Sequence, residues 1–297
     1  MREFLLLDLP MVASALLALI ACGTLGNWLV LRKESMTGDA VAHAVLPGLV
    51  AGFLVAGRHS IAAMFTGAAV AGVAAILLAG WIRRSTRLDP GAALGIVFTS
   101  FFALGVALLE TQGARQIDLD PNCVLFGALE TLFYVPPASG SWLEGVPREF
   151  WTLAAAAGIA VAFSLAACKE LTALAFDAEH ARVSGIAPRW LEPALLCTVS
   201  MVVVASFEAV GSLLVVALLA CPSLIAAPHA SRIGTRFAIS LGAGAAITVA
   251  GHLIAAYAPR ALGTQAALNT AGMIATLLAA AVPASFALRA LLNRRRA

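Results

Sequence analysis

GDAVAHAVLPGLVAGFLVAG, residues 38–57, is apolar enough for a bilayer crossing, yet it contains an aspartate, a histidine and a proline. Asp39 and His43 are four residues apart, so on a helix they lie on one face, close enough to bind a single ion together. Ionisable residues are rare inside membrane helices and usually serve function. The pattern indicates an ion or proton site, although Asp39 after Gly38 also suits a helix N-cap.

Pro47 follows His43 by four residues and has no N–H, so the carbonyl of His43 loses its partner within the helix. We therefore predict a kink at Pro47 and Gly48, beside the candidate site. Gly48 and Gly52 form a small-xxx-small pair, a pattern that lets a second helix come close in lipid.

The whole composition is that of a membrane protein. The 297 residues are 61% hydrophobic and 12% charged, with a mean hydropathy of +0.93, unlike any soluble globular domain. We predict an all-α polytopic transmembrane bundle, a single domain over residues 1–297 with about nine spans, eight being possible. The nine candidates are 10–31, 39–57, 60–82, 92–110, 150–168, 190–208, 210–228, 236–257 and 266–288.

The basic residues are distributed unevenly between the connections. One set of connections holds Arg32, Lys33, Arg83, Arg84, Arg87, Lys169, Arg182, Arg189, Arg232, Arg236, Arg289 and Arg294 to Arg296. The other set holds Arg2, Arg58, Arg115, Arg148 and Arg260. Cytoplasmic loops are rich in Lys and Arg, so we expect the N-terminus outside and the C-terminus in the cytoplasm. The net charge of +3 follows from this bias and does not indicate a nucleic-acid partner.

The long connection 111–149 falls on the outer side by this argument. It is acidic, holding Asp118, Asp120, Glu130, Glu144 and Glu149 against Arg115 and Arg148. An acidic outer mouth suits a cation, and an ordinary solvated loop is an equal alternative. Residues 120–133, DPNCVLFGALETLF, are apolar enough for a short interfacial or re-entrant helix.

On the cytoplasmic side, the pattern predicts a short helix at about residues 176–187. Asp177 suits the N-cap, Glu179 and Arg182 are spaced i,i+3, and Gly185 suits the position after the helix. Such a helix is too short to be stable alone and needs a surface to rest on. It is either a connector lying on the protein itself or a docking helix for a cytoplasmic partner.

Other ionisable residues give weaker signals. Glu208, Gly211 and Pro222 interrupt the apolar run 190–228, and Glu208 can reach an outer surface. His252 suits a hydrogen bond to a neighbouring helix better than a ligand role, and His180 and His229 support no site. The chain has no Walker-type, HExxH or GxSxG motif, so any ATPase must be another chain.

Three strings together resemble a known family. GDAVAHAVLPG, FDAEHARVSGI and FEAVGSLLVVALLACPSLIA are similar to the membrane permease subunits of ABC-type manganese, zinc and iron uptake transporters, the ABC-3 family of type II importers. The resemblance covers about residues 10–290. It implies that Asp39 and His43 bind the transported metal ion, with no permanently bound cofactor.

The resemblance also implies partners. These are a second permease copy, a cytoplasmic ABC ATPase and an extracytoplasmic metal-binding protein, around a multi-pass protein of the bacterial inner membrane surrounded by lipid. The ATPase-coupling helix matches residues 176–187, with Phe176, Asp177, Glu179, Ala181, Arg182 and Gly185. Glu208 stands where a Gln or Lys is more usual in the family. His229 and His252 match no family pattern.

Two other functional classes remain open at this point. A secondary metal transporter, or a proton-coupled transporter or channel, would use Asp39 and His43 as a proton relay. An intramembrane enzyme would need a second catalytic cluster. Asp and His together suit Mn²⁺, Zn²⁺ or Fe²⁺, so the sequence does not identify the metal.

Overall fold

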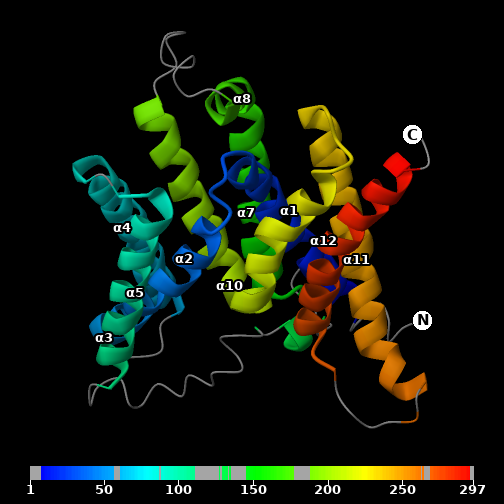
Figure 1. Ribbon diagram of the computed structural model, residues 1–297. Helices are drawn as coiled ribbons and strands as arrows, with labels where there is room; N and C mark the ends of the chain where they lie inside the picture. The colour runs from blue at the N-terminus through cyan, green and yellow to red at the C-terminus, as the bar shows by residue number, and fades with distance from the viewer. Residues whose placement is uncertain are drawn as a thin grey trace. The chain divides into compact units, whose positions relative to one another are not determined.

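The computed structural model is built of helices, as the sequence predicts (Figure 1). It describes residues 8–56, 61–86, 88–110, 127, 129–132, 134, 145–176, 188–261, 263 and 268–294. Its elements are α1 (Leu9–Leu31), α2 (Thr37–Ala44), α3 (Leu46–Ala56), α4 (Ile61–Ser85), α5 (Pro90–Leu109), η2 (Leu129–Thr131), α7 (Arg148–Ala166), α8 (Cys168–Phe176), α10 (Pro188–Ala226), α11 (Ile233–Ala261) and α12 (Thr270–Arg294). Within the described residues, eight helical segments are long and apolar enough to cross a membrane, α2 and α3 together forming one.

The difference from nine predicted spans lies in α10. The predicted spans 190–208 and 210–228 are one element of 39 residues, interrupted at Gly211 with φ 75° and ψ 164°. Gly211 divides α10 into two helical stretches joined across a kink, so both predicted spans are present within this one element. As straight helix its 39 residues would measure about 58 Å, twice the hydrocarbon thickness of about 30 Å. The sequence located the break correctly, and glycine makes it at a single residue because it tolerates positive φ.

The chain forms two compact units, which are described separately. Unit 1 comprises residues 1–30, 121–162 and 206–297, and unit 2 comprises residues 31–120 and 163–205.

In unit 2, α3 packs closely on α4 and α5 (Figure 1). A methyl group at Gly48 would overlap the carbonyl oxygen of Gly67, and one at Gly52 would overlap that of Ala63. The small-xxx-small pair thus brings α3 and α4 into backbone contact, as the sequence predicts. Gly105 of α5 similarly leaves room for Leu46.

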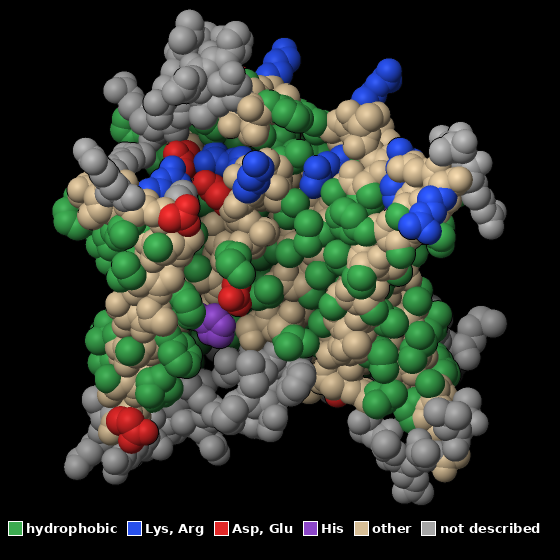
Figure 2. Space-filling view, viewed as in Figure 1, with side chains coloured by type: hydrophobic (Ala, Val, Ile, Leu, Met, Phe, Trp, Pro, Cys, Tyr) green, Lys and Arg blue, Asp and Glu red, His purple; other side chains and the backbone are tan. Residues whose placement is uncertain are grey.

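The interior of unit 2 is formed by small and aliphatic side chains. Ala44, Ala75, Ala79 and Val97 form one buried cluster, against which Phe101 packs. Large hydrophobic side chains also remain exposed, and Figure 2 shows them along the visible faces of α4 and α12. Exposed apolar surface on long apolar helices is what a lipid environment requires.

Unit 1 contains α11, α12 and most of α1 and α10. Gly26 of α1 leaves room for the backbone of Leu219, and Gly251 of α11 leaves room for Ile274 of α12. The buried Asn27 donates through Nδ2 to Ser240 Oγ at 2.8 Å. Close helix contacts at glycine and a polar side chain bonded between helices are typical of packing in lipid.

The described part of the predicted outer connection belongs to unit 1. Residues 129–131 form the short η2 element, while most of the interfacial helix predicted for 120–133 lies outside the described residues. Gly127, itself at φ 72°, lies against the backbone at Gly211, where a methyl group would not fit. Glu130 Oε1 accepts the N–H of Thr270 at 2.8 Å, which ties this connection to the start of α12.

Candidate functional site

The two candidate ligands lie on α2, one helical turn apart. Met36 occupies the N-cap position of α2 and makes no side-chain capping bond. Asp39 is in the first turn and His43 in the last. The capping interpretation of Asp39 is therefore wrong. A carboxylate in the first turn is favoured by the helix dipole, as is a cationic side chain near the last turn.

Asp39 and His43 point their side chains toward each other. His43 Nε2 lies 3.5 Å from Asp39 Oδ1, with 39% of the His43 side chain and 49% of the Asp39 side chain exposed. Two ligand atoms at about 2.1 Å from one metal ion, in tetrahedral arrangement, are about 3.4 Å apart. The pair can therefore coordinate one ion and keep its other coordination positions open.

The hydrogen bonding of the helix has a break just after His43, while the backbone at Val45 keeps helical angles, φ -73° and ψ -28°. α2 ends at Ala44, and α3 begins at Leu46, with Val45 between them. Pro47 is buried in the first turn of α3 and cannot donate the hydrogen bond that would reach the His43 carbonyl. Gly48, also buried, contacts α4. His43 thus lies in the turn just before this break in the hydrogen bonding, and the turn after it is packed against α4.

Two phenyl rings of α5 contact the imidazole of His43. The ring centroid of Phe98 is 5.6 Å away with an interplanar angle of 39°, and that of Phe102 is 5.7 Å away at 87°. The sequence analysis missed both, because a phenylalanine in an apolar run looks like any core or lipid-facing residue. Their i,i+4 spacing was the available signal.

One chain provides two ligands at this position. Within the part of the chain that the structure describes, no third His, Cys, Asp or Glu joins Asp39 and His43 to form a larger metal-binding group. Structural and catalytic zinc sites in proteins, by comparison, use three or four protein ligands.

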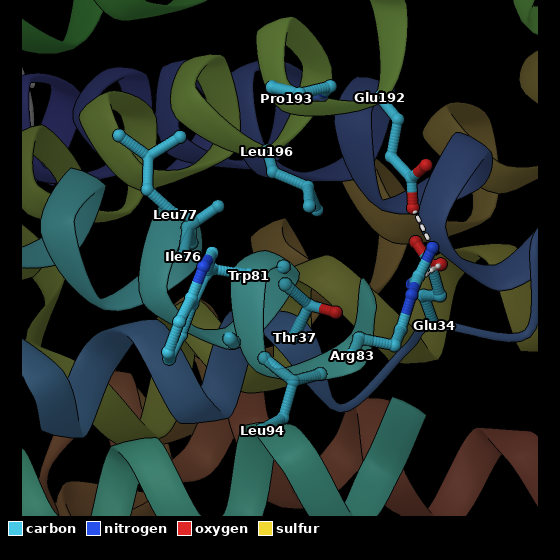
Figure 3. Close-up of a pocket in the computed structure, with 12 residues that line it drawn as sticks. Glu34, Thr37, Ile76, Leu77, Trp81, Arg83, Leu94, Glu192, Pro193 and Leu196 are labelled. Carbon is cyan, nitrogen blue, oxygen red and sulfur yellow. Dashed lines mark hydrogen bonds and ion pairs between the residues drawn. The ribbon is translucent and has the colours of Figure 1, made fainter. Parts of the chain in front are cut away.

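A second polar cluster, the four-residue ion-pair network, lies at the end of unit 2 from which α2 starts. Arg32 Nη2 is 3.2 Å from both Glu34 Oε1 and Glu192 Oε1, and Arg83 pairs with the same two carboxylates. Figure 3 shows Arg83 reaching between Glu34 and Glu192. Exposure of the four side chains ranges from 8% to 34%, so the network is largely buried.

The ion-pair network borders a cavity of about 160 Å³ (Figure 3). Glu34, Thr37 and Arg83 lie on its polar side, and Trp81, Leu94 and Leu196 are among its apolar walls. The sequence analysis missed this network because its partners come from three separate segments. In the sequence, the local signal for such a network was the acidic residue Glu192 close to an apolar run.

The predicted ATPase-coupling residues fall largely outside the described part of the chain. Phe176 is the last residue of α8 and its side chain is 72% exposed. Asp177, Glu179, Ala181, Arg182 and Gly185 lie outside the described residues, as does His180.

Three ionisable residues of unit 1 that the sequence analysis named, His252, His229 and Glu208, have polar partners. His252 Nε2 lies 3.2 Å from Asp8 Oδ1, which confirms the predicted hydrogen bond to a neighbouring helix. His229 Nε2 lies 3.1 Å from Ser285 Oγ. Glu208 accepts from Arg148 Nη2 through both carboxylate oxygens, at 3.1 and 3.3 Å.

Comparison with known proteins agrees with this description. Residues 3–282 match the model of the ABC 3 transport family. The chain is 34% identical over 249 residues to the manganese transport system membrane protein MntD of Bacillus subtilis, covering 83% of this chain and 82% of that protein. It is 32% identical to the chelated iron transport system membrane protein YfeD of Yersinia pestis, covering 72% of this chain and 65% of that protein.

A solved structure shows the same fold. The structure described as PsaBC from Streptococcus pneumoniae in complex with Fab superposes with a TM-score of 0.72 at 24% identity, covering 93% of this chain and 89% of that one. An all-helical, multi-pass membrane fold with a family match over most of its length leads to one conclusion: the chain belongs to the ABC 3 transport family.

Proposed function

We propose that this chain is the membrane permease subunit of an ATP-driven importer that carries a divalent first-row metal ion, Mn²⁺, Zn²⁺ or Fe²⁺, across a bacterial inner membrane. The observation that carries the proposal is the Asp39–His43 pair, which presents an oxygen and a nitrogen 3.5 Å apart on a membrane helix. Carboxylate and imidazole together suit these ions. Relatives named for manganese and chelated iron transport support the same substrate class.

We further propose that two copies of the chain share one ion. One copy offers two ligands at this position, whereas two copies offer two carboxylates and two imidazoles, enough for a complete coordination shell. The half-exposed side chains of Asp39 and His43 leave room for such an approach.

The remaining partners follow from the family and the charge distribution. A separate cytoplasmic ATPase supplies ATP hydrolysis and docks on residues 176–187, and an extracytoplasmic protein delivers the metal ion. The basic connections face the cytoplasm, with the N-terminus outside. This topology requires the chain to cross the membrane on each side of Gly211, and the length of α10 allows two crossings.

Replacement of His43 tests the transport role. The complex, reconstituted in liposomes with its ATPase and binding protein, is assayed for ATP-dependent uptake of radiolabelled manganese, zinc and iron. We expect His43→Ala to abolish uptake of the metal that the wild type carries, while membrane assembly is unchanged. His229→Ala is the matched control, since that histidine belongs to unit 1 and is paired with Ser285 there.

Two results would contradict this proposal. Full uptake by His43→Ala would show that this histidine is not needed in the transport path. Uptake that proceeds without ATP and follows an imposed proton gradient would indicate a proton-coupled secondary transporter instead.

A further inference from the structure

The imidazole of His43 is held against α5 by aromatic contacts. Phe98 and Phe102 are four residues apart, so they project from one face of α5. Their ring centroids lie 5.6 and 5.7 Å from that of the imidazole, one ring tilted and the other edge-on. Both distances fall within the range of about 4.5 to 7 Å in which aromatic rings attract each other.

These contacts matter because, among the described residues, the second ring nitrogen of His43 has no polar partner. A metal-binding histidine normally donates its second ring N–H to a carboxylate or carbonyl, which fixes the direction of the ring. Among the described residues, the polar partner of His43 is Asp39, reached through Nε2. That nitrogen faces the ion position, so among these residues the ring direction depends on packing.

The position of α5 is itself well determined. Gly105 of α5 leaves room for Leu46 and the backbone nitrogen of Pro47, directly after the break. Phe101, the residue before Phe102 on α5, packs instead against the buried cluster that includes Ala44 and Val97. The helix that carries the two phenyl rings, α5, is therefore packed against the residues that follow His43 and against the buried cluster.

We propose that Phe98 and Phe102 are positioning residues for transport, holding the His43 ring with Nε2 toward Asp39. This inference rests on the proposed metal site at Asp39 and His43. The backbone stays helical through Val45, which fixes where His43 leaves the helix, while the aromatic contacts fix the direction of its ring. The result is a half-site whose ligands already have the spacing for one ion.

The experiment measures Co²⁺ binding to the purified full-length permease in complex with its ATPase. Visible absorption of Co²⁺ reports both affinity and coordination geometry. We expect the double variant Phe98→Leu/Phe102→Leu to bind Co²⁺ about tenfold more weakly or worse, with a changed spectrum, the usual cost of losing support behind a metal ligand. Phe98→Tyr/Phe102→Tyr keeps both rings and should restore most of the affinity.

Phe101→Leu is the matched control. It makes the same chemical change on the same helix and removes packing from the buried cluster, so it should lower thermal stability and leave Co²⁺ affinity unchanged. If the double variant does not assemble, Phe102→Leu alone serves, because 43% of that residue is exposed and its loss is tolerated more easily.

The outcomes separate this inference from the proposed function. Wild-type affinity and spectrum in the leucine variant, with binding lost in His43→Ala, would overturn the positioning role alone. Equal loss of affinity in Phe101→Leu would also overturn it, since the effect would then be general packing. Wild-type Co²⁺ binding by His43→Ala would overturn the proposed metal site itself.

Discussion

At the residue scale, the proposed site comprises three side chains in consecutive turns. Asp39 and His43 pair across one turn of α2, and Pro47 lies in the first turn of α3, one turn later. The i,i+4 spacing made the first two predictable from sequence, because a helix places them on one face. The aromatic contacts of His43 were not predictable, since they depend on how α5 packs beside α2.

Replacing Pro47 tests whether the break matters. Pro47 lies in the first turn of α3, where proline is tolerated, so Pro47→Ala should gain well under the full helix-interior penalty of about 3 kcal/mol. The restored N–H can bond the His43 carbonyl and join α2 to α3. We expect normal assembly and thermal stability, with a clearly lower uptake rate in liposomes.

Unchanged uptake by Pro47→Ala would mean that the break is a tolerated irregularity. Pro259→Ala in α11 is the control for proline removal elsewhere, because that residue lies inside a helix of unit 1.

At the element scale, the four-residue ion-pair network joins the segment before α2, the end of α4 and the start of α10. Its members are far apart in sequence, so a single sequence cannot reveal the pairing. The Gly211 break in α10 shows the opposite case, in which the sequence located the interruption. It did not give the conformation, which depends on Gly127 packing against that backbone.

Neutralising Glu192 tests the contribution of this network. Glu192 faces both Arg32 and Arg83, so Glu192→Gln leaves two largely buried guanidinium groups with less compensation. We expect a loss of about 1.5–3 kcal/mol in unfolding free energy, the range for hydrogen bonds to charged groups. Thermal unfolding of the detergent-solubilised protein measures it, with Glu149→Gln as the control. A loss no greater than that of the control would show that the network contributes little to stability.

At the scale of the whole molecule, composition was enough to predict an all-helical membrane protein, because a bilayer admits few other structures. The number of spans depends on Gly211, whose break divides α10 into two helical stretches. At this scale we propose that Asp39 and His43 of two permease copies complete a single metal site.

The stoichiometry of bound metal tests the shared site. Native mass spectrometry of the purified permease with its ATPase, equilibrated with Mn²⁺ or Zn²⁺ and freed of excess ion, counts ions per assembly. We expect one tightly bound ion per two permease chains in the wild type and none in His43→Ala or Asp39→Asn. One ion per permease chain, or an unchanged count in both variants, would rule out a site shared by two copies.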